Sequence, residues 1–220
     1  MQQPYDVFNE ITAVSTYSKA WDILKRFFPD LLLIVLLLMV FQIPAGAFAE
    51  KDEGFNWFTP LYWLLILGPV SFSLAFATLQ VVRENRFKLD PAFDVFKKNY
   101  FNLLLANLLQ SVIVGIGMVF LIVPGIIFAV RLAFVPYLVT EKSMDAVEAV
   151  KASWKMTGPY AWRIFFMGLL AIPIAIGGLI LLGVGIIISV MWISAAFAMI
   201  YHLVSKEREN QTGEDVVQEE

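Results

Sequence analysis

The sequence predicts an all-α, polytopic membrane bundle of six transmembrane helices, arranged as three repeats of a cytoplasmic amphipathic helix followed by a hairpin. Its composition is 59% hydrophobic and 16% charged, whereas soluble domains are about 45–50% apolar and about 25% charged. The apolar residues lie in long blocks, which is the pattern of membrane helices. Acidic residues fall between these blocks, and lysines and arginines gather on one side of them.

Four apolar blocks supply the six predicted spans, since a helix needs about 20 apolar residues to cross a bilayer. Two blocks have the length of one span. The other two, 102–140 and 164–205, are twice as long, and we expect turns at Val123-Pro124-Gly125 and Gly183-Val184-Gly185. The predicted spans are 31–49, 60–82, 102–122, 125–140, 164–182 and 186–205. Residues 1–205 thus form a single membrane domain, and 206–220 are predicted to be an acidic disordered tail.

The charged residues support this count and orient it. None of the 19 aspartates and glutamates lies in a predicted span, as expected because a carboxylate in hydrocarbon is costly. All of the 16 lysines and arginines except Lys51 and Arg131 fall on one side of the membrane in this scheme. The positive-inside rule then predicts that both termini and the two long loops are cytoplasmic.

An internal repeat links the cytoplasmic segments to the hairpins. The segment 21–26, which runs into the leucines at 31–33, recurs 72 residues later at 93–98, and a looser copy runs from Ser153 to Phe166. Apolar and basic residues alternate in these segments, which favours helices lying in the inner interface with their lysines toward lipid phosphates. Ordinary packed connecting helices are the alternative. Ser143 is the expected N-cap of the third such helix, and Gly158-Pro159 its expected end. The interfacial basic candidates are Lys25, Arg26, Lys97, Lys98, Lys155 and Arg163.

Arg131 is the most informative single residue, because it lies inside a predicted span and an intramembrane charge is a functional hypothesis. No span offers it a carboxylate. Its candidate partners are neutral groups on other spans, backbone carbonyls or a bound anion, and snorkelling to the outer headgroups is the alternative. The neutral candidates are Asn107, Gln110, Ser111 and Gln42. We therefore treat Arg131, Asn107 and Gln110 as candidates for lipid or anion binding, with hydrogen bonds between helices as the ordinary use of the two amides.

Several classes of chemistry lack the residues they need. The chain has no cysteine and one histidine, so disulfides and thiolate catalysis are excluded and a conventional metal site is not expected. No Ser/His/Asp set or phosphate-binding glycine loop is present, and no basic run indicates nucleic-acid binding. The sequence predicts no catalytic residue, metal or cofactor.

The stretch Val123–Ala129, followed by Leu132-Ala133, Pro136 and Leu138-Val139, and the helix after it, Lys142–Ala149 with Ser153–Thr157 and Trp162-Arg163, resemble the YciC-like family of bacterial inner-membrane proteins. They also resemble the membrane domain attached to some glycerophosphodiester phosphodiesterases, and related membrane families of unknown function. The resemblance is specific over 122–166. It implies a location in the bacterial inner membrane but no biochemical role, and no phosphodiesterase catalytic domain is present.

The sequence favours a non-enzymatic membrane protein that interacts with lipid or assists a partner complex. Its expected partners are membrane lipids, with a membrane-protein partner or a second copy of the chain as further candidates. A small transporter or channel that uses the interface between repeats is the alternative function. A membrane enzyme fits least, because clustered polar groups are scarce.

Overall fold

The computed structural model describes residues 11–49, 58–84, 89–180 and 184–218, and the regular structure in these ranges is helical. The elements are α2 (Ala13–Arg26), α3 (Phe28–Ala49), α4 (Phe58–Tyr62), the π-helix η1 (Trp63–Leu67), α5 (Gly68–Glu84), α6 (Leu89–Phe120), α7 (Ile122–Arg131), α8 (Val135–Glu141), α9 (Ala146–Thr157), α10 (Ala161–Ile180) and α11 (Val184–Gln218). Five continuous stretches are long and apolar enough to cross a membrane, namely 58–84, 93–120, 122–141, 161–180 and 184–209. The pair α2 and α3, which meet at a bend of 96°, is the sixth candidate. An all-helical fold with five to six apolar helices that could span a membrane is therefore confirmed over the described residues.

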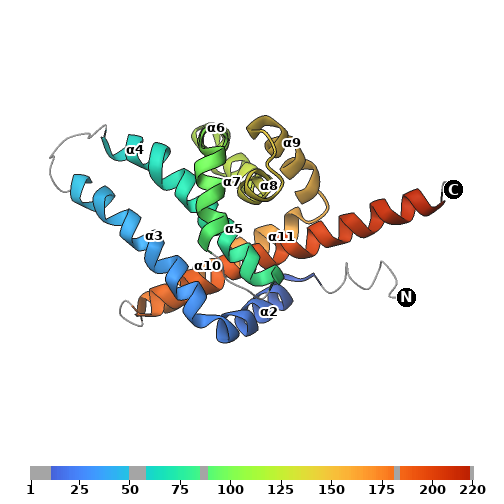
Figure 1. Ribbon diagram of the computed structural model, residues 1–220, viewed down its shortest axis with the longest axis horizontal. Coiled ribbons are helices and arrows are strands. Elements are labelled where there is room, and N and C mark those ends of the chain that lie inside the picture. Colours follow the sequence, from blue (N-terminus) through green and yellow to red (C-terminus); the bar gives the residue numbers. More distant parts are fainter. Residues whose placement is uncertain (1–10, 50–57, 85–88, 181–183, 219–220) are drawn as a thin grey trace.

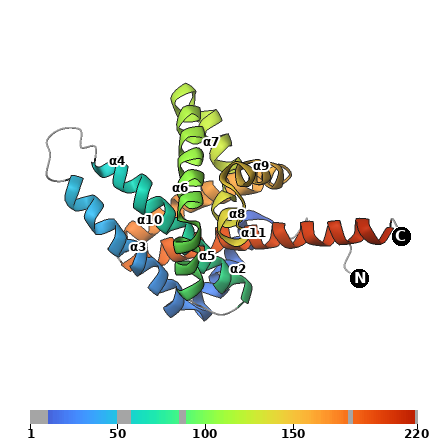
Figure 2. The same ribbon diagram turned by 45° about the horizontal axis from the view of Figure 1, so that its top comes forward.

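Three antiparallel hairpins diverge from a shared base. The first is formed by α3 and α4–α5, the second by α6 and α7–α8, and the third by α10 and α11. In Figure 1 the turn-side ends of the first and third hairpins lie to the left, and Figure 2 shows α6 and α7 rising together away from α11. The turn-side end of the second hairpin thus points away from α11.

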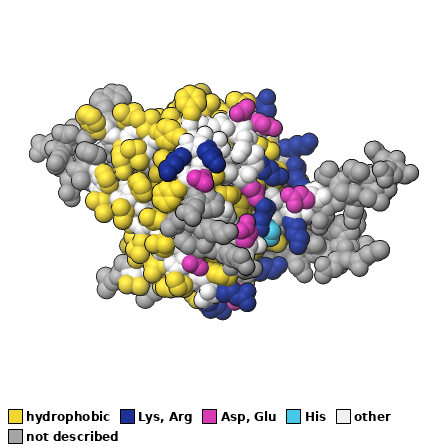
Figure 3. Space-filling view, viewed as in Figure 1, with side chains coloured by type: hydrophobic (Ala, Val, Ile, Leu, Met, Phe, Trp, Pro, Cys, Tyr) yellow, Lys and Arg dark blue, Asp and Glu magenta, His cyan; other side chains and the backbone are white. Residues whose placement is uncertain are grey.

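The core lies at the base, where α5, α8 and α11 meet. Its largest fully buried side chains include Leu79, Phe134, Leu138 and Tyr201. In the most apolar stretch of the span 58–84, which includes α5, 61% is buried. In the corresponding stretches of α6 and α10 only 17% is buried. Figure 3 shows apolar side chains over the turn-side part of the face in view and most of the lysines and arginines toward the opposite end, with some basic side chains near the middle and at the lower edge. The exposed apolar side chains of α6 and α10 therefore match a lipid surrounding rather than water.

The first hairpin contains a break that explains two polar residues on α6. Pro69 has no N–H to give the Leu65 carbonyl, and η1 departs from the α-helical bonding pattern here. Tyr100 donates its hydroxyl to the Leu65 carbonyl at 2.7 Å, and Asn107 donates Nδ2 to the Leu64 carbonyl at 3.4 Å. Because hydrocarbon offers no hydrogen bonds, carbonyls freed in a span need such protein donors.

Helical segments precede all three hairpins, as the sequence analysis expects. The first is α2, which starts with a capping box between Thr12 and Ser15. The second is the start of α6, which is kinked at Asn99, where the backbone leaves the helical region. The third is α9, and its predicted end is confirmed, since α9 stops at Thr157 with Gly158 as its C-cap. The structural similarity of the three units stays a prediction.

The predicted N-cap of α9 is wrong. Ser143 has a positive φ of 49°, and Asp145 is the N-cap, without a side-chain hydrogen bond. The first N–H of the helix is instead bonded from α6, where Asn102 Oδ1 accepts from the Ala146 N–H at 3.1 Å. Asn102 also donates to the Met144 carbonyl at 2.9 Å, so α6 fixes where α9 begins.

The turn of the second hairpin also lies elsewhere than predicted. The chain breaks at Leu121, which is extended, and Val123-Pro124-Gly125 belongs to the first turn of α7. Proline is tolerated there because first-turn N–H groups have no helical partner. Of the other predicted turn, Val184 and Gly185 are helical, and Gly183 lies outside the described residues.

The predicted disordered tail, 206–220, differs from the structure as well. There α11 continues to Gln218, and the last two residues lie outside the described ranges. The Lys, Glu, Arg and Gln residues that follow the span favour helix, so a helix that is already formed in the span continues beyond it.

Candidate functional site

Arg131 lies where the end of α7 meets the last turn of α9. Its guanidinium Nη1 donates to the Trp154 carbonyl at 3.4 Å and lies over the Trp154 ring, 5.3 Å from the centroid. Its own carbonyl accepts hydrogen bonds from the hydroxyls of Ser153 at 2.8 Å and Thr157 at 3.0 Å. Carbonyls at a helix C-terminus attract cations. Among the predicted protein partners, a backbone carbonyl is therefore the one that Arg131 contacts in the described residues, and this contact places it beside α9.

The two amides predicted beside Arg131 are used differently. Asn107 bonds the Leu64 carbonyl and packs against Gly68, where an added Cβ would lie 2.0 Å from Asn107 Nδ2. Gln110 is half-buried, and its Oε1 has no hydrogen-bond partner among the described residues. No hydrogen bond in the described ranges joins Arg131 to Asn107, Gln110, Ser111 or Gln42. Asn107 thus has the ordinary role of bonding between helices.

Three grooves lie between neighbouring elements, and each has one basic side chain in an almost entirely apolar lining. The α7–α10 groove, of about 400 Å³, contains Arg131. The α2–α10 groove, of about 690 Å³, contains Arg163 and one hydroxyl, that of Thr12. The α3–α6 groove, of about 240 Å³, has an apolar surface, and Lys97 is the one charged residue among those that line it. A fourth cavity, of about 260 Å³ between α3, α5, α8 and α11, has no charged lining residue.

The six predicted interfacial basic residues divide between grooves and surface. Lys97 and Arg163 line grooves. Lys25 pairs with Asp22 at 2.9 Å on an exposed part of α2. Arg26, Lys98 and Lys155 are exposed. Exposed ion pairs of this kind contribute little to stability.

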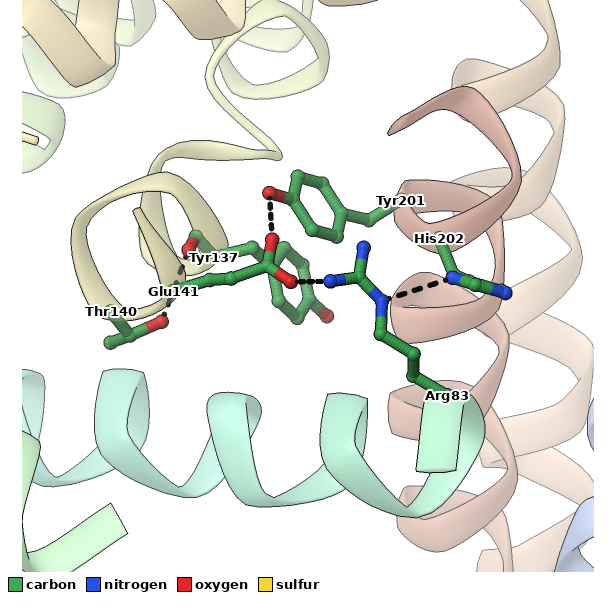
Figure 4. A network of polar contacts seen from close by, with 6 residues as sticks. All are labelled: Arg83, Tyr137, Thr140, Glu141, Tyr201 and His202. Carbon is green, nitrogen blue, oxygen red and sulfur yellow. Dashed lines mark hydrogen bonds and ion pairs between the residues drawn. The ribbon is translucent and has the colours of Figure 1, made fainter. Parts of the chain in front are cut away.

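A polar cluster at the base joins the three hairpins. Arg83 of α5 forms an ion pair with Glu141 of α8, and Tyr201 of α11 donates its hydroxyl to the second carboxylate oxygen of Glu141 at 2.6 Å. Arg83 Nε also donates to His202 Nδ1 at 3.2 Å, and Figure 4 shows Arg83 between the carboxylate and the imidazole. The Tyr137 ring stacks on the Tyr201 ring at 4.8 Å. We call Arg83, Glu141, Tyr201 and His202 the base cluster.

The base cluster was not predicted from the sequence. Arg83 counted only as one of the basic residues on one side of the spans, Glu141 as one of the acids outside them, and His202 as the single histidine. A signal was present, since all three residues sit at the cytoplasmic ends of predicted spans and so at a similar depth. Which spans are neighbours depends on tertiary packing, which the spacing of residues does not show.

A second acid is buried nearby in the fold. Tyr160 donates its hydroxyl to Glu207 at 2.5 Å, and Glu207 is 8% exposed. Burial, followed by the hydrogen bond and the negative charge of Glu207, raises the pKa of Tyr160. The phenol therefore stays protonated at neutral pH and can keep donating to the carboxylate. This contact attaches the start of α10 to α11.

In the part of the chain that the structure describes, no group of three or more histidine, cysteine, aspartate or glutamate residues could hold a metal ion. Comparisons with known proteins find no family model that matches the chain, no similar curated protein and no similar solved structure. The family resemblance therefore stays an expectation from the sequence. The grooves and the base cluster are the features of the described residues that bear on function.

Proposed function

We propose that this protein is a non-enzymatic protein of the bacterial inner membrane that binds membrane lipids between its hairpins and so organises lipid or supports a membrane partner. The observation that carries the proposal is the composition of the grooves at Arg131 and Arg163, each with one basic residue in an apolar lining. The third groove has an apolar surface that Lys97 borders. A phospholipid has the same division, since its phosphate is anionic and its chains are apolar. A polar solute would find too few hydrogen-bond partners in such a lining.

Retained lipid tests this proposal. We expect native mass spectrometry of the protein, extracted in mild detergent, to show copies that keep phospholipid. Lys97→Gln and Arg163→Gln should each lower the mean number of retained lipids, because charge-assisted bonds to phosphate are stronger than neutral ones. Lys151→Gln, which removes an exposed lysine of α9 that lines none of these grooves, is the charge control. Lipid-free protein from every extraction would contradict the proposal.

Transport is the second candidate function, and the fourth cavity is the observation that favours it. Its lining includes the hydroxyl-bearing residues Ser71, Thr78 and Ser194 among apolar side chains. The cavity is smaller than most ligand sites, which are about 300–1,000 Å³. Counterflow of a small solute in vesicles that contain the purified protein would favour transport over lipid binding as the function.

The proposed orientation can be tested by cysteine labelling without a signal from native thiols, because the chain has no cysteine. We expect single cysteines at Lys151 or near the C-terminus to react with a membrane-impermeant maleimide only after cells are opened. A cysteine at Gly54, in the predicted outer loop, should react in intact cells once the outer membrane is permeabilised. Labelling of Lys151→Cys in such intact cells would contradict the positive-inside assignment.

A further inference from the structure

We propose that the α7–α10 groove is the binding site of one phospholipid, whose phosphate lies on the Arg131 guanidinium and whose acyl chain follows α7 toward the hairpin turn. This inference rests on the proposed lipid-binding function and deepens it by assigning one site. It follows from the state of the Arg131 side chain, the pattern along α7 and the position of the groove.

The Arg131 guanidinium has donors to spare. A guanidinium carries five N–H donors, and in the described ranges this one makes a single long hydrogen bond, 3.4 Å to the Trp154 carbonyl, and no ion pair. The Trp154 ring lies under its face and Gly158 lies beside it, where an added Cβ would be 3.0 Å from Nη1. The planar group is therefore oriented but not neutralised, which suits two parallel bonds to a phosphate.

The apolar part of the groove has the form of a stripe. Val123, Ile126, Ile127 and Val130 line it from α7, and the intervals of three, four and seven residues put them on one helix face. The opposite wall is Ala161, Trp162 and Phe165 of α10. From Val123 to Arg131 the stripe extends about 12 Å at 1.5 Å per residue.

This order of residues identifies the occupant. The stripe has its cation at one end and Val123, near the hairpin turn, at the other, so the occupant is a molecule with an anionic head and an apolar chain. Trp162 is 73% exposed beside Arg131 in the lining, and tryptophan favours the headgroup level of a bilayer. A free inorganic anion would leave the stripe unused. A second protein helix would need a small-residue face, but this lining is mainly branched and aromatic.

The other two grooves fit a defined site less well. Arg163 lies over the Tyr160 ring, 5.7 Å from its centroid, and takes part in further interactions. Lys97 is an exposed, flexible point charge in the smallest of the three grooves. Only Arg131 combines a planar cation held by its surroundings with a continuous apolar stripe.

Two kinds of variant test the site separately for charge and for shape. Arg131→Gln removes the cation, and Ile127→Trp fills the stripe while it keeps the cation. Lys151→Gln on α9 is the charge control. Ile116→Trp on α6 is the shape control, since Ile116 is 53% exposed and Ile127 48%, and Ile116 does not line the groove. Size-exclusion profiles and thermal unfolding show whether each variant is folded.

The measurement is native mass spectrometry after titration with phosphatidylglycerol or phosphatidylethanolamine, with the dissociation constant of the last retained lipid as the readout. We expect Arg131→Gln and Ile127→Trp each to raise this dissociation constant by about tenfold or more, and Arg131→Lys to raise it by less. Both controls should leave it unchanged. We also expect inorganic phosphate not to displace the lipid. If Arg131→Gln does not fold, Ile127→Trp decides.

The outcomes separate the site from the general function. Wild-type protein without retained lipid overturns the lipid-binding function itself. Wild-type protein that keeps lipid as tightly as folded Arg131→Gln and Ile127→Trp overturns only the α7–α10 site. Displacement by inorganic phosphate would reveal a free-anion site and would likewise overturn the phospholipid assignment.

Discussion

Replacement of Glu141 by glutamine is expected to lower the free energy of unfolding by about 2–3 kcal/mol. Removal of one partner of a buried ion pair costs about 3–5 kcal/mol because it leaves the other charge uncompensated. The Glu141 side chain is 14% exposed and that of Arg83 is 32% exposed, so water reduces the expected loss. The variant also exchanges a charge-assisted bond from the Tyr201 hydroxyl for a weaker neutral one. Unfolding by sodium dodecyl sulfate in mixed micelles, followed by circular dichroism, measures the change.

Two comparisons make this result specific to the base cluster. Glu148→Gln removes an exposed acid of α9 and should change the free energy of unfolding by less than about 0.5 kcal/mol. In a double-mutant cycle, Arg83→Gln with Glu141→Gln should cost clearly less than the sum of the single changes. Equal losses for Glu141→Gln and Glu148→Gln, or additive losses in the cycle, would show that the cluster does not hold the hairpins together.

The second large effect is expected at Gly178, where α10 packs tightly against α11. A Cβ there would lie 2.2 Å from Ser189 Oγ and 2.6 Å from the Gly185 carbonyl oxygen. Because the latter is backbone, the helices have to separate, and the hydrogen bond from Ser189 Oγ to the Ile174 carbonyl, 2.8 Å long, is strained with them. We expect Gly178→Ala to lower the free energy of unfolding by about 2–3 kcal/mol.

The neighbouring glycine is the matched control. An added Cβ on Gly177 would meet nothing within 4 Å. Gly177→Ala should therefore leave stability unchanged or raise it by about 0.5–1 kcal/mol, because alanine is the better helix former. The same denaturation assay compares the two variants. A loss for Gly177→Ala as large as that for Gly178→Ala would contradict the close helix contact.

The membrane spans could be predicted from the sequence because their cause is local. An apolar block of the right length has to form a helix in lipid whatever its neighbours are, and the described helices fall on all six predicted spans. The end of α9 at Gly158 is equally local. The turn predicted at Val123-Pro124-Gly125 lies after the actual break at Leu121. The reason is that Pro124 indicates a turn but is also tolerated within the first turn of a helix.

The candidate site depended on contacts that spacing alone does not determine. Arg131 was identified as important because a charge within an apolar block is visible in the sequence. Its partner Trp154 is 23 positions away and becomes a neighbour only because the last turn of α9 packs against the end of α7. The base cluster needs three hairpins to converge at one depth. Pro69 indicates an unsatisfied carbonyl, but only the packing of α6 shows that Tyr100 supplies the donor.

The divergence of the hairpins has a practical consequence for handling the protein. Where hairpins separate, amphiphile molecules rather than protein atoms complete the packing around α6 and α10, which are 17% buried in their most apolar windows. The base instead carries its own contacts through α5, α8 and α11. Short-chain detergents cover a thinner apolar layer than a bilayer does, and mismatch of this kind distorts apolar segments. Extraction should therefore loosen the turn-side halves first, while the base keeps its packing.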